Sequence, residues 1–212
     1  MKKRKKPIRK MPLEAYLSTL EIFDDYPLLD YRKISDLSLI GQDDYRIILD
    51  ACIFEKVTIN QNKFLRAEFI DCTFINCDLS NNTFTDSSFI RCEFKGCKFI
   101  GTHFVQNYLT DILFDDCNLQ YLDLAENKIK IVEIKNSLLK ESNWFENTMN
   151  GIVFDENNLT EAMFYNNPLK GLDISTCIID GIKMDRISVE GVTIDNYQAA
   201  VFCHMLGIKV NK

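Results

Sequence analysis

The residues of this sequence whose side chains could bind metals or catalyse a reaction are its eight cysteines and two histidines. A zinc clamp places two cysteines about two residues apart, whereas neighbours such as Cys72 and Cys77 are separated by five positions. Neither His103 nor His204 has an acid or a nucleophile at a recognisable spacing, and the sequence holds no glycine-rich phosphate loop. We therefore expect no metal site, no cofactor and no enzymatic activity, and we interpret the cysteines as compact apolar core residues.

Carboxylates form the remaining candidate set, and they gather in two stretches without Lys or Arg, residues 111–127 and 141–166. Carboxylates on a surface can pair with the arginine and lysine side chains of a partner protein. Lysines between residues 128 and 140 interrupt this acidic surface, and the alternative interpretation is that the acids serve only solubility. The candidate partner-binding residues are Asp111, Asp115, Asp116, Asp123, Glu126, Glu141, Glu146, Asp155, Glu156 and Glu161.

The charge of the chain is unevenly distributed. The formal net charge is −6, but the first ten residues, MKKRKKPIRK, hold seven of the 25 basic residues and no acid. The remaining chain is therefore strongly acidic, which disfavours direct binding to nucleic acid or to anionic membranes and favours basic partners. For the basic tail we expect a disordered solubilising end, with contact to phosphate or lipid headgroups as the alternative.

The elements that must position these acids follow from a period of five residues. From Leu49 to Ile194 every fifth residue is large and apolar, and twelve of the 15 phenylalanines occupy these centre positions. This period fits neither a helix nor a single strand. The residue two positions before each centre is small or of medium size, and this slot holds seven of the eight cysteines. Since residues two apart on an extended chain share a face, each unit points one bulky and one small side chain inward, as in a stacked solenoid.

Asparagines and cysteines in the small slot indicate the length of one coil. They recur every 20 residues, which is four units, so each coil has four sides. Stacking then places equivalent side chains above one another, where asparagines can bond along the stack. The columns are Asn62 and Asn82; Asn107, Asn127, Asn147 and Asn167; Cys52, Cys72 and Cys92; and Cys77, Cys97 and Cys117.

The five-residue units resemble the pentapeptide-repeat family, whose pattern is A(D/N)LXX. CDLSN, CNLQY, CEFKG and CKFIG are good matches, and the resemblance covers residues 49–194. It implies an all-β fold, a right-handed quadrilateral β-helix. We expect residues 1–48 to form a basic tail and an N-terminal cap, with a short amphipathic helix in MPLEAYLSTLEIF, residues 49–195 to form the β-helix, and residues 196–212 to form a C-terminal cap.

The C-terminal segment narrows the resemblance. After Ile194 the five-residue rule ends, and we expect a helix from about Asn196 to Met205 followed by a short strand in GIKV. The closing QA and LGI are similar to the ends of Qnr quinolone-resistance proteins. That resemblance implies a homodimer joined through this end, and a DNA-like rod that binds DNA gyrase and topoisomerase IV. It implies cap and dimer roles for Tyr197, Val201, Phe202, Met205 and Leu206.

Two functions remain open from the sequence. The first is an acidic DNA mimic that binds a type II topoisomerase and protects it from quinolones, although the unbroken repeat lacks the loop insertions that many Qnr proteins carry. The second is a scaffold that binds another protein through a flat side, using apolar residues just after the centres. No apolar run approaches the length of a membrane span, and we expect a cytoplasmic protein. We expect the apolar outward residues to pack under the N-terminal segment, with a partner-binding patch as the alternative. These residues are Leu65, Ile70, Ile75, Ile90, Ile100 and Val105.

Overall fold

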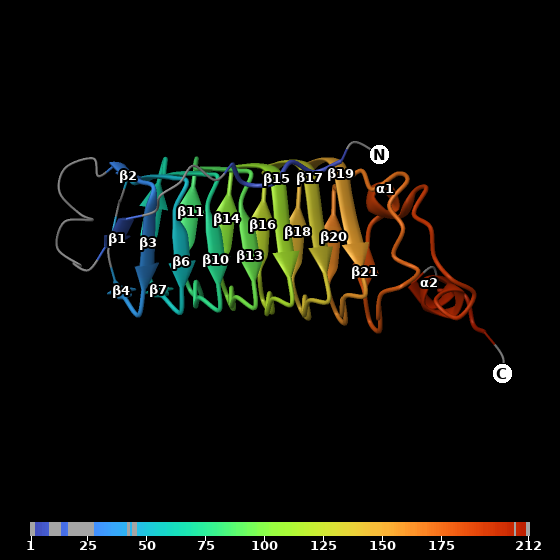
Figure 1. Cartoon of the computed structure of the whole chain (residues 1–212). Coiled ribbons are helices and arrows are strands. Elements are labelled where there is room, and N and C mark those ends of the chain that lie inside the picture. The colour runs from blue at the N-terminus through green and yellow to red at the C-terminus, as the bar shows by residue number, and fades with distance from the viewer. Residues whose placement is uncertain are drawn as a thin grey trace.

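The structure is a computed structural model that describes residues 3–8, 14–16, 28–41, 43, 46–205 and 207–210. It is a rod of about eight stacked parallel coils with two short helices near the C-terminal end (Figure 1). Each coil has four sides, and equivalent residues of neighbouring coils are 20 apart, as in the pairs Leu49 with Phe69 and Phe84 with Phe104. The all-β quadrilateral solenoid predicted from the five-residue period is therefore confirmed.

Sides 1 and 2 form one continuous 12-stranded sheet. Side 1 contains β2 (Leu28–Asp30), β5 (Ile48–Asp50), β9 (Glu68–Ile70) and β12 (Ser88–Ile90). Side 2 contains β3 (Arg32–Ser35), β6 (Ile53–Glu55), β10 (Thr73–Ile75) and β13 (Glu93–Lys95), with β1 (Glu14–Tyr16) paired to β3. In the next three coils one long strand runs through both sides: β15 (Tyr108–Asp115), β17 (Lys128–Lys135) and β19 (Thr148–Asp155).

Sides 3 and 4 complete the square. Side 3 contains β4 (Ser38–Ile40) and β7 (Thr58–Asn60) and continues as single bridges from Asp78 to Ile178. Side 4 is a seven-stranded sheet. Its strands are β8 (Lys63–Leu65), β11 (Thr83–Thr85), β14 (His103–Val105), β16 (Asp123–Ala125), β18 (Asn143–Phe145), β20 (Met163–Tyr165) and β21 (Lys183–Met184).

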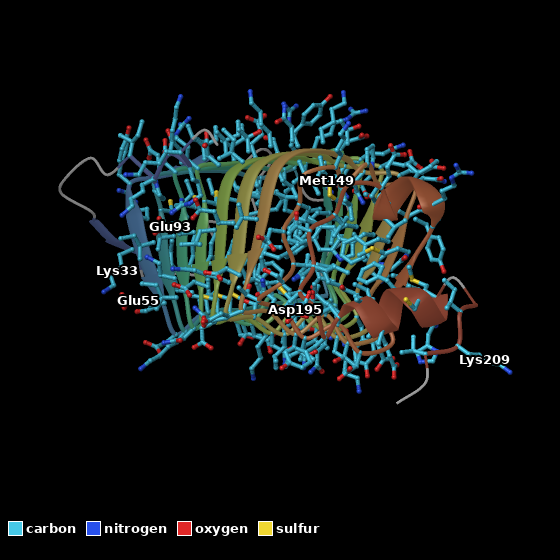
Figure 2. The ribbon with its side chains drawn as sticks, turned by 90° about the vertical axis from the view of Figure 1, so that its right-hand side faces the viewer. Lys33, Glu55, Glu93, Met149, Asp195 and Lys209 are labelled. Carbon is cyan, nitrogen blue, oxygen red and sulfur yellow. The ribbon has the colours of Figure 1, made fainter. Side chains whose placement is uncertain are left out.

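The hand of the coil is visible when the rod is viewed from its C-terminal end. In Figure 2 Met149 of side 1 lies at the top and Glu93 of side 2 lies at the left. The chain passes from side 1 to side 2 as it advances toward the viewer, so the coil is right-handed.

The corners between sides explain why the period is five. The residue two positions after each centre has a positive φ at most of the corners from Ala51 to Gly171. This left-handed conformation turns the chain through the corner after each short extended segment. Glycine, asparagine and aspartate adopt it most readily, yet several corners carry glutamate, such as Glu126 with φ 58°. Corner side chains point away from the rod and form columns along its edges.

The centre residues fill the interior in four files. Phe64, Phe84 and Phe104 stack with ring centroids 4.9 and 5.0 Å apart, and Leu124 follows them in register. Ring stacking of this kind adds to the apolar burial that stabilises the fold. Most centres are fully buried, while Met149 is only partly so.

The small slots hold the predicted columns. Asn62 bonds to Asn82, and the run from Asn107 to Asn167 bonds from coil to coil through side-chain amides. The stacked cysteines are buried and free. Their thiols donate to main-chain carbonyls, as Cys72 does to Leu49 at 3.4 Å, which fits their interpretation as core residues.

The coils begin earlier than Leu49. Strands β2, β3 and β4 pair in the same 20-residue register with β5, β6 and β7, and they place Leu29 and Ile34 in the core. The first coil therefore lies within the segment that the sequence analysis assigns to a cap. Asp44 stands where the five-residue count requires an apolar residue, and this interruption hid the first coil. The helix predicted in residues 11–23 is wrong for residues 14–16, which form strand β1. The other residues of the predicted helix lie outside those described.

The repeat is interrupted before Ile194 by a short helix, although Thr193 still pairs with Asp173 in the 20-residue register. Asp185 caps helix α1 (Arg186–Val189) by accepting a hydrogen bond from the Ser188 amide at 2.8 Å. The Ser188 hydroxyl then continues the small-slot column, because its Oγ accepts a hydrogen bond from the main-chain amide of Asn167 at 3.0 Å. The five-residue count would place Ile187 in this slot instead of Ser188. Val189 and Ile194 are consequently only half-buried.

Helix α2 (Ala199–Met205) agrees with the predicted C-terminal helix, and Gln198 closes the last coil. Its Nε2 donates to the carbonyls of Ile174 and Cys177 at 2.9 and 2.7 Å. The strand predicted in GIKV is wrong, because residues 207–210 contain no strand. None of the helices in the described residues is long and apolar enough to cross a membrane.

Candidate partner-binding surface

Five of the ten predicted acids lie on side 4 or at its two corners. Asp123 lies on the outer face of β16. Glu126 and Glu146 form a column at the corner between sides 4 and 1, and Glu141 and Glu161 form a column at the corner between sides 3 and 4. The predicted set lacks Asp86, which is exposed in the same corner column as Glu126. We call these six residues the acidic panel: Asp86, Asp123, Glu126, Glu141, Glu146 and Glu161.

Main-chain hydrogen bonds fix the spacing within the panel columns. The Glu126 amide donates to the Phe145 carbonyl at 2.9 Å, and the Glu141 amide donates to the Thr160 carbonyl at 3.0 Å. Adjacent coils therefore lie at strand spacing, about 4.8 Å. Carboxylates stacked at that spacing repel each other. In the column at the corner between sides 4 and 1, amides partly offset this repulsion: Gln106 donates to Glu126 at 2.9 Å and Asn166 to Glu146 at 3.3 Å.

In the coils from Asn81 to Asn166, side 4 and its two corners carry no Lys or Arg. The lysines that interrupt the acids in the sequence lie on other sides. Lys128 and Lys130 belong to side 1, and Lys135 belongs to side 2. Lys140 lies on side 3 and pairs with Glu141 at 3.7 Å, so it borders the panel without entering it. Folding thus separates charges that alternate along the chain.

Two aromatic residues lie between the acidic columns. Phe145 and Tyr165 are neighbours in register on β18 and β20 and are 39% and 37% exposed. On the same side Asp123 accepts from Asn143 at 2.8 Å and pairs with His103 at 3.1 Å. The panel therefore combines exposed carboxylates at its edges with a partly apolar centre.

The other five predicted acids lie away from the panel. Asp115 and Asp155 are on side 2, where Asp115 pairs with Lys135 at 3.4 Å. Asp116 and Glu156 are exposed at the corner between sides 2 and 3. Asp111 is only 6% exposed at the corner between sides 1 and 2, because the N-terminal segment covers it. The predicted set is thus divided between two regions of the rod.

The basic tail is the largest departure from expectation. Residues 3–8 lie along the rod at the corner between sides 1 and 2, and Arg4 is buried against Glu93. The expectation of a disordered tail is therefore wrong for these residues. One signal in the sequence could have indicated a covered surface here, because Leu113 is an apolar residue at an outward position.

The predicted C-terminal cap residues divide into buried and exposed ones. Phe202 is buried in the core cluster, with Val201 and Met205 packed against it. Tyr197 is 90% exposed, and Leu206 lies outside the described residues. The cap therefore closes the last coil and leaves one aromatic side chain accessible at the end of the rod.

Cys72 and Cys97 have the properties of buried core thiols. Burial raises the pKa of Cys72, and the neighbouring Cys117 thiol raises the pKa of Cys97 to about 12. A high pKa keeps a thiol protonated and unreactive. Within the described residues no group of three or more His, Cys, Asp or Glu side chains could hold a metal ion.

The apolar outward residues near the start of the rod do not form one patch. Leu65 and Val105 lie on side 4, Ile70 and Ile90 on side 1, and Ile75 on side 2. Ile100 belongs to side 3. These six residues are therefore spread over all four sides of the rod.

Comparison with known proteins identifies the repeat. Residues 67–144 match the family model described as a pentapeptide repeat region. No curated protein sequence matches the chain. Similar solved structures include a trypsin-treated variant of QnrB1, a plasmid-mediated fluoroquinolone resistance protein (20% identity, 89% of this chain and 100% of that chain, TM-score 0.37). They also include HetL, involved in heterocyst differentiation regulation in Nostoc sp. strain PCC 7120 (11% identity, 84% and 93%, TM-score 0.32).

Proposed function

We propose that this chain, whose residues 67–144 match the pentapeptide repeat region, is a DNA mimic that binds a type II topoisomerase, DNA gyrase or topoisomerase IV. The acidic panel on side 4 is the observation that carries this proposal. Its carboxylates would take the places of DNA phosphates against arginine and lysine side chains of the enzyme. Protection of the enzyme from quinolones follows if the bound rod displaces DNA from the site where the drug acts.

The geometry of the panel suits this role. Duplex DNA presents one phosphate about every 3.4 Å along each strand, and each panel column holds one pair of glutamates in adjacent coils, about 4.8 Å apart along the rod. Two such columns border one flat side, and in the coils from Asn81 to Asn166 neither this side nor its two corners carry Lys or Arg. Repulsion within the columns lowers the stability of the rod. Binding of the carboxylates to the enzyme would explain why positions 126, 141, 146 and 161 hold glutamates rather than neutral residues.

The C-terminal end is proposed as the contact of a homodimer. Tyr197 is almost fully exposed there, and Ile178 and Ile187 are each 54% exposed near the last coil. Joining two rods through these ends would extend the acidic surface beyond one chain. Size-exclusion chromatography with light scattering tests this contact, and a Tyr197→Asp variant should then be monomeric.

The experiment that tests the function is DNA supercoiling by purified gyrase and decatenation by topoisomerase IV, with and without a fluoroquinolone. Micromolar protein should inhibit the enzyme or restore activity in the presence of the drug, and the effect should weaken steeply as salt rises. A variant with Glu126, Glu141, Glu146 and Glu161 changed to Gln should lose the effect. A control with the same type of change at Asp115, Asp116, Asp155 and Glu156 should keep it, and absence of any effect of the wild type would exclude the proposal.

The second candidate is a scaffold that binds another protein through side 4. The exposed pair Phe145 and Tyr165 favours it, because partly exposed aromatic residues often anchor protein interfaces. Binding would then persist at high salt and depend on these rings. A pull-down repeated at low and high salt, with Phe145→Ser, separates the two candidates.

A further inference from the structure

The N-terminal segment contacts residues of the rod that are far from it in sequence. Arg4 donates from Nη2 to Glu93 Oε1 at 2.9 Å, and its Nε lies 3.5 Å from Glu133 Oε2. The main-chain amide of Lys5 donates to Asp111 Oδ1 at 2.9 Å. The main-chain amide of Ile8 donates to Asp71 Oδ1 at 2.8 Å. Figure 1 shows this segment running along the upper edge of the strands, opposite in direction to the growth of the coils.

The tail covers the outward residues that it contacts. We define the tail channel as Asp71, Glu93, Asp111, Leu113 and Glu133. Its first four residues occupy outward or corner positions, yet they are between 5% and 8% exposed. Elsewhere on the rod outward acids remain accessible, as the side chain of Asp123 does at 30%.

Recognition in the channel uses the main chain and one arginine. Arg4 is 8% exposed, whereas Lys5 and Lys6 are exposed. The carboxylates of Asp71 and Asp111 accept main-chain amides, which every extended segment other than proline can supply. Glu93 and Glu133 both contact one planar guanidinium, a geometry that suits arginine better than lysine.

The electrostatics of Glu93 agree with a formed ion pair. Burial alone raises the pKa of this carboxyl, but hydrogen bonds and charge from Lys95 and Arg4 outweigh burial and lower it. The carboxylate is therefore ionised at neutral pH and ready to receive a cation. Lys95 contacts the other carboxylate oxygen, Oε2, at 2.7 Å, so Arg4 and Lys95 each bind one oxygen of Glu93.

We propose that the tail channel is a binding site for an extended basic segment with one arginine, that residues 3–8 are its intramolecular ligand, and that the basic segment of a second protein binds by displacing them. The contacts that hold residues 3–8 require no feature peculiar to this tail beyond an arginine and free main-chain amides one and four positions after it. Because the tail is tethered, its effective concentration is on the order of millimolar, so a free segment competes poorly until the tail is released. The channel lies on side 2 and at the corner between sides 1 and 2, so the proposal is independent of the acidic panel.

The test uses the full chain and a fluorescent peptide with the sequence of residues 1–10. Arg4→Glu places a like charge against Glu93 and should release the tail, so the peptide should bind this variant at least about tenfold tighter than the wild type. Lys6→Glu makes the same charge change at an exposed side chain and should bind the peptide as weakly as the wild type. A peptide in which the arginine equivalent to Arg4 is replaced by lysine should bind Arg4→Glu more weakly.

A second set of variants separates the channel from general attraction to acids. Adding Glu93→Gln and Asp111→Asn to Arg4→Glu should abolish peptide binding, while adding Glu126→Gln and Glu146→Gln should leave it unchanged. Equal binding to wild type and Arg4→Glu, or loss through the panel substitutions alone, would overturn the proposal. If Arg4→Glu folds poorly, hydrogen exchange on the wild type serves instead: excess peptide should accelerate exchange of the Lys5 and Ile8 amides, and unchanged protection would refute displacement.

Discussion

The side chain of Asn127 bonds directly to that of Asn147 in the next coil: its Nδ2 donates to Asn147 Oδ1 at 2.9 Å. The same nitrogen donates to the Phe104 carbonyl, and Asn127 Oδ1 accepts from the main-chain and side-chain nitrogens of Asn107. Each asparagine of this column thus satisfies buried groups of the coils on both sides of it. The column joins the coils by side chains as well as by strand pairing.

Replacing Asn127 with alanine should lower the free energy of unfolding by about 2–4 kcal/mol, because it leaves several buried donors and acceptors unpaired. Urea denaturation measured by circular dichroism gives this value. Asn150 is exposed on β19 and provides the matched control. Asn150→Ala should change stability by less than about 0.5 kcal/mol. Similar losses for both variants would contradict the assignment of the column to the interior.

Phe94 tests the apolar files. Its ring stacks on Phe74 and Phe114 at 4.9 and 5.0 Å and is 1% exposed. Phe94→Ala should cost about 3–5 kcal/mol, as truncation of a buried aromatic ring does. Lys98→Ala removes an exposed side chain on the next side and should cost under about 0.5 kcal/mol. Denaturant midpoints of the two variants measure the difference, and equal midpoints would contradict the assignment of inside and outside.

The parts of the fold that the sequence predicted are those that depend on local spacing. Burial imposes a bulky residue at each centre and a small one two positions before it, and this demand repeats in every unit, so the files and the asparagine columns could be read directly. The ends could not, since Asp44 breaks the count before the second coil and the α1 cap at Asp185 shifts the small slot to Ser188.

The candidate surfaces depended on contacts between distant residues. Arg4 and Glu93 are 89 positions apart, and nothing in the repeat pattern links them. The assignment of lysines to sides could have been made by counting along the 20-residue coil, which would have separated Lys128 and Lys135 from the panel. The acids were found from composition, whereas their division between panel and channel required the coil register.

Ile131 is a strained corner. It is a β-branched residue with φ 57°, a conformation that such residues rarely adopt. Ile131→Asn should raise the free energy of unfolding by about 1 kcal/mol, since asparagine tolerates the left-handed region better. Ile131→Val keeps the branched Cβ and should give no gain. A destabilised asparagine variant in urea denaturation would show that the half-buried isoleucine side chain contributes more than the strain costs.

The buried pair of Arg4 and Glu93 should make stability depend on pH. The folded-state pKa of Glu93 is lowered, so the unfolded chain binds more protons at acidic pH. The stabilisation is present above the unfolded pKa, about 4.3, and is lost as the pH falls through the lower folded value. Between about pH 5 and 3 the wild type should therefore lose stability more steeply than Glu93→Gln. Parallel curves from urea titrations at each pH would show that the pair contributes nothing to this dependence.

The stacked carboxylates Glu126 and Glu146 should be unfavourable for the free protein. Glu146→Gln removes one like-charge contact and should raise the free energy of unfolding by about 0.2–1 kcal/mol at low salt, with a smaller gain at high salt. Glu156 is the matched control, because it is an exposed glutamate at a corner with a positive φ whose column neighbours, Asn136 and Thr176, are uncharged. Glu156→Gln should leave stability nearly unchanged at any salt concentration.

If the panel binds the basic groove of a topoisomerase, Glu146→Gln should also weaken inhibition of supercoiling, and the same substitution would then stabilise the rod and impair its function. A gain in stability without any loss of inhibition would indicate that Glu146 lies outside the contact, and equal stability of the two glutamine variants would remove the argument that the column is kept for binding.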